Sequence, residues 1–349
     1  MNVLSLFDGM SCGQIALERA GVTVNNYYAS EIDKYAIKVT QANFPNTVPL
    51  GDIKKHNEWN LPEIDLIIAG FPCQAWSTAG KMKGDNDPRG ALVHDLIEVW
   101  GKYKPKYFLF ENVKMKKEFM EYINTLFGVE PILINSALVS AQNRKRYYWT
   151  NIPGIEQPVD KGIDWGDVRE NGVSEESFYY SDKAMQWLGR NSQKRNKALD
   201  VHLNDEKMQM IEASHYKKYS QQRFFGIIDN PEIDCSIGAM RGRFCINGKR
   251  QDGKVKTAGK TVQYIEFRRD LKSNALSTVT KDNVVVPFTL PNRVPAGDFL
   301  FRYITPVECE RLQTLDDNYT NHVSNTQRYK MIGNGFTVDV IAHILKGLI

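Results

Sequence analysis

The residues best placed to do chemistry lie in one short run, Ile67 to Gln74. An apolar stretch, Asp65 to Ala69, is typical of a strand covered on both faces. Gly70 and Pro72 end this strand and fix the direction of the turn. Cys73 should then lie at the carboxyl end of the strand, where open α/β sheets place their chemistry. Most free cysteines are small buried hydrophobes, so Cys73 is a candidate nucleophile only if other residues lower its pKa or supply a base.

Acidic and basic side chains follow a second apolar run, Tyr107 to Phe110. This strand would deliver Glu111 to the same edge as Cys73. A carboxyl group beside aromatic residues should have a raised pKa, which suits a proton donor; the alternative is an ordinary glutamate paired with lysine. Gln142, Arg144 and Arg146 alternate with period two, so an extended backbone would turn all three to one face. The alternative for the arginines is a basic surface.

The N-terminal segment has the pattern of a nucleotide-binding unit. Val3 to Phe7 predicts a buried strand, and a glycine-containing turn leads into a helix that runs through Ala20 and ends at Gly21. Glycines let the backbone approach a ligand, and a helix N-terminus favours anionic groups. Glu31 follows a second strand, Tyr27 to Ser30, at the place where such sheets hold ribose hydroxyls. Because the full G-x-G-x-x-G is missing, a plain strand-to-helix turn is the alternative.

Two later segments could contribute to the same nucleotide-binding site. Asp52 and Ile53 follow a third extended run, Thr47 to Leu50, and could accept from an adenine amino group while packing its ring. A solvated Asp52 is the alternative. Apolar positions within Ala91 to Trp100 predict a helix packed on the sheet, and Leu92 at its start could contact a cofactor.

Taken together, these motifs resemble those of the DNA cytosine-5 methyltransferase family. The Pro-Cys-Gln run with the loop after it is similar to the nucleophile motif and active-site loop, Glu111-Asn112-Val113 to the base-protonating element, and the Gln-x-Arg-x-Arg segment to the part that holds a flipped cytosine and supports the nucleophile. The resemblance implies catalytic roles for Cys73, Glu111, Gln142, Arg144 and Arg146, and DNA contacts for Ser77, Lys81 and Arg89. The chain departs from many bacterial relatives at Cys12, where they carry a further glycine.

The same resemblance implies S-adenosylmethionine as the cofactor and no metal. The early strand ends are similar to the family's cofactor pocket, and the turn Gly333-Asn334-Gly335-Phe336 to the C-terminal motif that completes it. The implied cofactor-binding residues are Phe7, Asp8, Gly9, Met10, Ser11, Glu31, Ile32, Asp52, Ile53, Gly70, Pro72, Leu92, Asn334, Gly335 and Phe336.

The middle of the chain has a different composition. Residues 181–280 hold 19 Lys or Arg against 11 Asp or Glu, a net of +8, whereas the whole chain carries only +4. Ser236 to Phe244 and Thr261 to Phe267 predict short strands joined by glycine-rich turns. This segment occupies the place of the family's target-recognition region, where Arg and Lys read guanine edges and phosphates. We expect Arg241 and Arg243 to project from a turn, and the resemblance adds Thr278. A solvated basic face is the alternative.

We therefore expect an α/β fold: a doubly wound, Rossmann-like S-adenosylmethionine-dependent methyltransferase domain with an inserted, smaller, basic, β-rich target-recognition domain. The expected boundaries are 1–160 for the first part of the catalytic domain, 161–298 for the hinge and insert, and 299–349 for the return. In the return, Thr305 to Glu308 predicts a capping box with proline at the first helical position. A final helix should bury one face, made by Val338, Ile341, Ile344 and Leu345.

The expected activity is methyl transfer to C5 of a flipped cytosine at a specific short sequence in double-stranded DNA, through a covalent bond between Cys73 and C6. Two alternatives stay open. A tRNA cytosine-5 methyltransferase would be expected to carry Cys-Phe-Thr in the insert, where this chain has Phe244-Cys245-Ile246. An inactive DNA-binding homologue would be free to lose Cys73 or Glu111, and this chain keeps both.

The composition argues against a disulfide-bonded, a zinc-binding or a membrane protein. The five cysteines are widely spaced and include no Cys-x-x-Cys pair, which argues against a disulfide framework or a zinc site. No apolar run approaches the roughly 20 residues of a membrane span, and the N-terminus has no basic n-region. We expect a cytoplasmic monomer of bacterial or phage type, without a membrane or metal partner, and with a cognate restriction endonuclease as a candidate partner.

Overall fold

The computed structural model describes residues 1–72, 92–170, 173 and 304–349. Between them it describes the backbone of short strands at 199–203, 235–246, 249–250, 261–267, 273–274, 283–287 and 293–294. Five predicted site residues lie outside the described residues: Cys73, Ser77, Lys81, Arg89 and Thr278.

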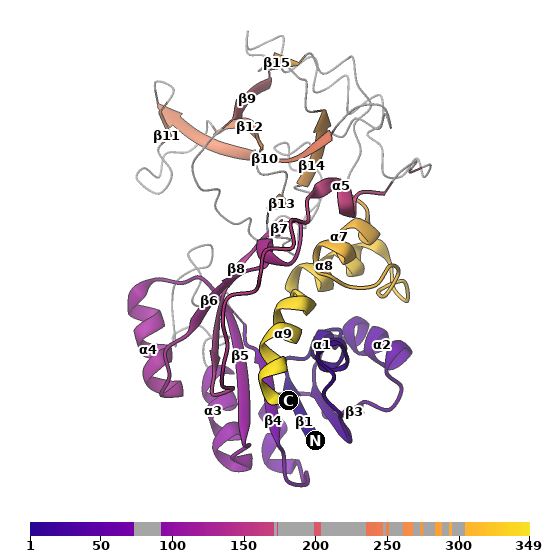
Figure 1. Ribbon diagram of the computed structural model, residues 1–349, viewed down its shortest axis with the longest axis vertical. Coiled ribbons are helices and arrows are strands. Elements are labelled where there is room, and N and C mark those ends of the chain that lie inside the picture. Colours follow the sequence, from indigo (N-terminus) through magenta and orange to yellow (C-terminus); the bar gives the residue numbers. More distant parts are fainter. Residues whose placement is uncertain are drawn as a thin grey trace.

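A seven-stranded sheet forms the centre of the catalytic part, with the strand order β3-β2-β1-β4-β5-β8-β6 (Figure 1). Its strands are β1 (Asn2–Leu6), β2 (Asn26–Ser30), β3 (Val48–Pro49), β4 (Leu66–Gly70), β5 (Tyr107–Val113), β6 (Ile132–Asn135) and β8 (Lys145–Thr150). Neighbours from β3 to β5 are parallel, and β8 runs antiparallel to both β5 and β6. The expected doubly wound α/β sheet is confirmed.

Both faces of this sheet are covered, because successive strand residues point to opposite sides. On β1, Val3 belongs to the core shared with the helices α1 (Cys12–Ala20) and α9 (Val338–Leu345), whereas Leu4 belongs to the core shared with α3 (Leu92–Tyr103) and α4 (Lys117–Phe127). The other helices of the described residues are α2 (Lys34–Asn43), α5 (Trp165–Val168), α7 (Pro306–Leu312) and α8 (Asn325–Asn334), with short 3-10 turns η1 (Ile53–Glu58), η3 (Ser136–Leu138) and η7 (Lys346–Leu348).

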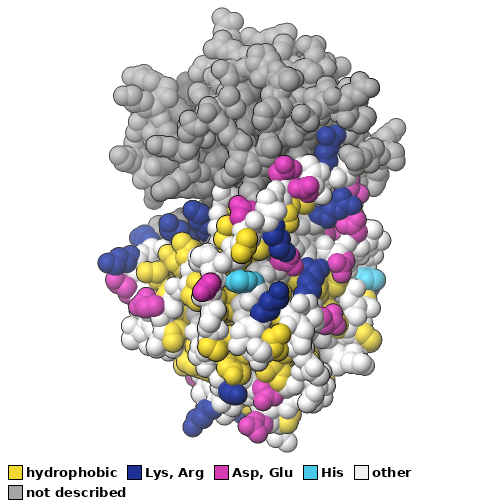
Figure 2. All heavy atoms as spheres, viewed as in Figure 1, with side chains coloured by type: hydrophobic (Ala, Val, Ile, Leu, Met, Phe, Trp, Pro, Cys, Tyr) yellow, Lys and Arg dark blue, Asp and Glu magenta, His cyan; other side chains and the backbone are white. Residues whose placement is uncertain are grey.

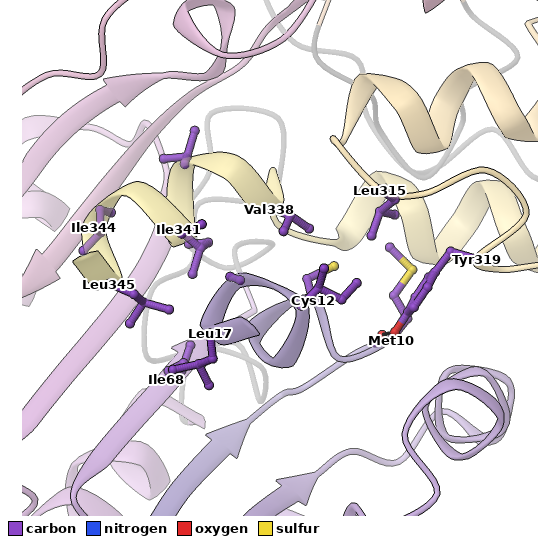
Figure 3. Close-up of a cluster of buried hydrophobic side chains, with 14 of the residues drawn as sticks. Met10, Cys12, Leu17, Ile68, Leu315, Tyr319, Val338, Ile341, Ile344 and Leu345 are labelled. Atoms are coloured by element: carbon purple, nitrogen blue, oxygen red, sulfur yellow. Dashed lines mark hydrogen bonds between the residues drawn. The ribbon is translucent and has the colours of Figure 1, made fainter. Parts of the chain in front are cut away.

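The C-terminal segment packs into the same core as the first strands. Thr305 and Glu308 form the predicted capping box at the start of α7, with reciprocal bonds of 3.1 and 2.8 Å between each side chain and the other's backbone N–H. The four apolar residues predicted on the last helix, Val338, Ile341, Ile344 and Leu345, are fully buried. Figure 3 shows α9 lying across α1 at this core. No described helix has the length and apolar character needed to cross a membrane.

A second sheet lies in the middle of the chain, drawn above the catalytic part in Figure 1. Its strands are β9 (Leu199–Leu203), β10 (Cys235–Ile246), β11 (Lys249–Arg250), β12 (Thr261–Phe267), β14 (Asn283–Pro287) and β15 (Arg293–Val294). One further ladder, β7 (Gln142–Asn143) with β13 (Ser273–Asn274), joins this region to the catalytic part.

One local prediction was wrong. Arg241 and Arg243 do not lie in a turn: β10 is continuous, and they pair with Tyr264 and Val262 of β12. The glycine between them was a turn signal, but it pairs within the ladder. In the catalytic part, β6 ends at Asn135, because the Asn135 side chain accepts a bond from the backbone of Ala137 (3.3 Å) and caps the turn η3.

Candidate active site

The turn after β1, Phe7 to Ser11, has an unusual backbone. Phe7, Gly9 and Ser11 all have positive φ, at 57°, 61° and 61°. Glycine accepts this region easily, but a residue with a side chain is destabilised there by roughly 1–2 kcal/mol. The surrounding contacts must therefore hold this turn, which we call the cofactor loop, in its shape.

Asp8 holds the cofactor loop from inside. Its carboxylate accepts bonds from the hydroxyls of Ser11 and Tyr27, the second at 2.8 Å. Its backbone N–H donates to the carbonyl of Ser30 at the end of β2 (3.1 Å). Burial raises the pKa of Asp8, although its hydroxyl partners lower it. The Asp8 side chain is thus directed into the core, which leaves backbone groups of the loop to face a ligand.

Glu31 and Ile32 follow β2 directly. The Glu31 carboxylate accepts three backbone N–H bonds, from Gly9 at 2.8 Å and from Ile32 and Asp33 at 2.7 Å each. This ties the end of β2 to the cofactor loop. Ile32 is 74% exposed, although an isoleucine is usually buried. An apolar side chain held open beside a fixed carboxylate suits a ligand that has both an apolar ring and hydroxyl groups.

Asp52 and Ile53 lie at the end of the next strand along the edge. Asp52 caps η1 by accepting from the backbone N–H of Lys54 (3.1 Å), and Ile53 is buried in the core under α3. Phe7 and Leu92 pack at the rim of the same core. A hollow behind the loop is lined in part by Gly9, Glu31 and Thr40. Phe7, Glu31 and Asp52 therefore follow the carboxyl ends of three neighbouring parallel strands, β1, β2 and β3.

Gly70, Glu111 and Phe336 meet at the point where β4 and β5 end. Gly70 pairs with Glu111 across the two strands. A methyl group on Gly70 would lie 2.8 Å from the Phe336 ring and 3.6 Å from the Glu111 carboxylate. Gly70 is therefore needed for close packing, and the C-terminal turn closes over the strand that leads to Cys73.

Glu111 is held by Arg146. The Arg146 Nε lies 2.9 Å from the Glu111 carboxylate, and both side chains are largely buried. Burial raises the pKa of Glu111, and the positive charges of Arg146 and Arg144 lower it without cancelling the effect of burial. A buried carboxyl group with a raised pKa beside a fixed cation is suited to giving and retaking a proton.

Gln142, Arg144 and Arg146 are all buried, and Lys145 between them is exposed, as the alternation predicts. Their contacts differ, however. Arg144 donates to the carbonyls of Gly333 (3.3 Å) and Gly335 (2.9 Å), and Gln142 donates to the carbonyl of Leu312 (2.9 Å). Arg146 thus lies against Glu111, Arg144 braces the C-terminal turn, and Gln142 holds the end of α7.

The comparison with known proteins decides the family. The family described as C-5 cytosine-specific DNA methylase matches residues 1–349. The chain belongs to this family. It is a DNA cytosine-5 methyltransferase, with relatives among bacterial type II enzymes and phage enzymes.

This DNA cytosine-5 methyltransferase is similar over its whole length to a phage enzyme and to a bacterial type II enzyme. Orphan methyltransferase M.SPRI of Bacillus phage SPR is 28% identical over 435 residues, covering 100% of this chain and 97% of that protein. Type II methyltransferase M1.ScrFI of Lactococcus lactis subsp. cremoris is 29% identical over 367 residues, covering 99% and 77%. The solved Entamoeba histolytica methyltransferase EhMeth shares the fold, with a TM-score of 0.60 at 17% identity over 100% of this chain and 97% of that one.

Two residues of this methyltransferase's site were missed by sequence reasoning. Asn112 is 1% exposed and donates to the carbonyl of Phe71 (3.2 Å), which anchors the backbone just before Pro72 and Cys73. Gln313 is fully buried, donates to the carbonyls of Ile332 (2.8 Å) and Gly335 (3.2 Å), and accepts from Gln142 (3.1 Å). The sequence could have identified Asn112, because it directly follows Glu111. No pattern in the neighbouring sequence indicated a role for Gln313.

The described surface carries charges of both signs. On the face shown in Figure 2, acidic and basic side chains are interspersed over the described part of the chain. Among the described residues, no group of three or more His, Cys, Asp or Glu side chains could hold a metal ion.

Proposed function

We propose that this methyltransferase methylates C5 of a flipped cytosine at a specific short sequence in double-stranded DNA, through a covalent bond between Cys73 and C6. The observation that carries the proposal is the meeting of Gly70, Glu111 and Phe336 at one sheet edge. It brings the strand that leads to Cys73, a buried proton donor and the C-terminal turn of the cofactor pocket to one place.

S-adenosylmethionine fits the cofactor side of this edge. Glu31 offers a fixed carboxylate for ribose hydroxyls, and the exposed Ile32 offers an apolar surface for adenine. We assign the rest of the pocket to the cofactor loop, Asp52, Ile53, Leu92 and the Asn334 to Phe336 turn, with Gly70 and Pro72 at its floor. When bound, this cofactor supplies a methyl group on a sulfonium, which is an electrophile that needs a carbon nucleophile.

The residues that face the cytosine turn its C5 into that carbon nucleophile. C5 of cytosine is unreactive, so the Cys73 thiolate adds to C6 while Glu111 gives its proton to N3, and the electron pair moves to C5. C5 takes the methyl group and then loses its own proton to a water molecule. The C5–H electron pair forms the C5–C6 double bond, the C6–S bond breaks so that Cys73 leaves as thiolate, and Glu111 takes back the N3 proton. Arg146 holds Glu111 in place. The base must leave the duplex stack for this, because C6 is out of reach inside it.

We assign DNA reading to the middle of the chain. The insert would span 161–298 between catalytic parts 1–160 and 299–349. Arg241 and Arg243 lie two residues apart on β10. Ser77, Lys81, Arg89 and Thr278 would contact the DNA around the flipped base. The protein would act as a cytoplasmic monomer, and the bacterial type II relatives favour a restriction endonuclease as partner.

Bisulfite sequencing of a plasmid from expressing cells tests this function. The host should lack cytosine methylation of its own, and a Cys73→Ala plasmid serves as control. We expect one short sequence to resist conversion only with the intact chain. A plasmid converted at every cytosine would contradict the proposal.

The two alternatives are tested in the same cells. Bisulfite treatment of total tRNA would show protected positions if RNA were the substrate. If neither nucleic acid is protected but the protein still retards duplex DNA in a gel, the chain is an inactive DNA-binding homologue.

A further inference from the structure

The cofactor loop is also braced from the far end of the chain. Tyr319, in the segment between α7 and α8, donates from its hydroxyl to the backbone carbonyl of Met10 (2.6 Å). Both residues are buried, and Figure 3 shows the Tyr319 ring lying against Met10. This bond crosses 309 positions of sequence. It reaches the loop between Gly9 and Ser11, two of the residues with positive φ.

Tyr319 is itself held on both sides by one carboxylate. Glu310, fully buried, accepts from the backbone N–H of Asn318 (2.7 Å) and of Thr320 (2.9 Å). Arg328 pairs with the same carboxylate at 3.0 Å and donates to the Thr320 hydroxyl at 2.9 Å. A buried, charge-assisted cluster of this kind is rigid, because breaking one partner leaves an uncompensated charge.

We propose that Tyr319 is a positioning residue for S-adenosylmethionine, which acts by holding the Met10 carbonyl and so the binding shape of the cofactor loop. This inference rests on the proposed cofactor site. Without the hydroxyl, the Met10 carbonyl stays buried without its donor, and the loop can relax from its left-handed residues. If only a fraction of molecules then has the binding shape, the apparent affinity falls by that fraction.

The chain offers a matched control. Tyr329, in α8, is also buried and also donates to a backbone carbonyl, that of Ile304 (2.7 Å). Tyr319→Phe and Tyr329→Phe therefore remove the same group from similar surroundings, but only the first touches the cofactor loop. A merely structural role predicts equal effects of the two changes.

Titration calorimetry with S-adenosylmethionine compares the full-length wild type with both variants. We expect Tyr319→Phe to raise the dissociation constant about five- to thirtyfold, as for a buried carbonyl that loses its donor, and Tyr329→Phe to leave it unchanged. In steady-state assays the KM for the cofactor should rise, whereas kcat at saturation and the affinity for DNA should not change. Equal affinities in all three proteins, or equal losses in both variants, would overturn the inference.

Hydrogen exchange separates this inference from the proposed function. In the free protein, Tyr319→Phe should speed amide exchange of residues 7–12 more than Tyr329→Phe does. If the wild type fails to bind S-adenosylmethionine, the proposed function fails, and this experiment still tests the brace. Unchanged exchange in Tyr319→Phe would refute it.

Discussion

The two halves of the catalytic sheet carry different kinds of chemistry. From β3 to β4 the strands are parallel, and the site is made largely of backbone: a loop with three positive φ values, fixed by Asp8 and Glu31. From β5 to β8 the strands are antiparallel, and the site is made of buried charged side chains, Glu111 with Arg146. We therefore expect the first half to fix the shape of the cofactor loop, and the second to supply a proton and a charge.

Because of this difference, substitutions in the two halves should change different properties of the enzyme. On the backbone half, a substitution acts by moving the loop, and it should change cofactor affinity more than the rate at saturation. On the charged half, a substitution acts on the chemistry itself. The C-terminal segment serves both, because Arg144 and Gln313 hold the same turn, at the carbonyl of Gly335.

The largest expected effect is on the proposed nucleophile, which follows β4 in the sequence, where the two halves adjoin. Cys73→Ala should abolish methyl transfer, because the thiol is the proposed nucleophile that adds to C6, and should leave S-adenosylmethionine binding intact, because the thiol acts on the base. Transfer of labelled methyl to DNA and calorimetry measure the two properties. Cys309→Ala, a buried thiol in α7, is the control and should retain transfer. Transfer by Cys73→Ala at the wild-type rate would refute the covalent mechanism.

On the backbone half, Gly335→Ala should disturb packing. The added methyl would lie 2.8 Å from Met10, 3.2 Å from Cys12 and 3.3 Å from the carbonyl of Met331. Overpacking of this kind costs about 1–3 kcal/mol of unfolding free energy. Denaturant titration measures it. The control is Gly101→Ala in α3, where nothing lies within 4 Å, and which should stabilise by about 0.5–1 kcal/mol. Equal stability of the two variants would contradict this packing.

We propose that DNA contacts in the insert bring the target cytosine to the charged half. If Arg241 and Arg243 contact base edges, each change to Ala should weaken target binding by about 1–3 kcal/mol and relax discrimination at one base pair. If they contact only phosphate, binding should weaken on all sequences with a shallower salt slope. We expect base contact for at least one. Measuring the affinity for target and single-mismatch duplexes at two salt concentrations distinguishes base contact from phosphate contact. Unchanged affinity and discrimination in both variants would mean that other residues recognise the target sequence.

The smallest effect is a pH dependence of stability. Burial raises the pKa of Glu111 above its usual value of 4.5, so the folded protein holds this proton to higher pH than the unfolded chain does. Its contribution to stability is therefore complete below pH 4.5 and is lost as pH rises through the raised pKa. The unfolding free energy of the wild type relative to Glu111→Gln should fall in that window. A rise instead would mean that the Arg146 charge outweighs burial.

Local patterns predicted much of this fold, because they depend on neighbours in sequence. The end of α1 at Gly21 and the capping box at Thr305 follow from residues within one turn. Gln313 and Tyr319 could not be found in this way, because their partners lie far off in sequence. Arg241 and Arg243 were misplaced because a glycine that signals a turn locally can still pair within a sheet.

Covalent trapping tests both halves in one measurement. A duplex that carries the target sequence with 5-fluorocytosine is incubated with the enzyme and S-adenosylmethionine labelled in the methyl group. Fluorine at C5 cannot leave as a proton does, so we predict a denaturation-resistant complex that contains DNA, protein and label, with the DNA attached at Cys73 by peptide mapping. If an enzyme active on ordinary DNA forms no such complex, or forms it at another residue, the account is wrong.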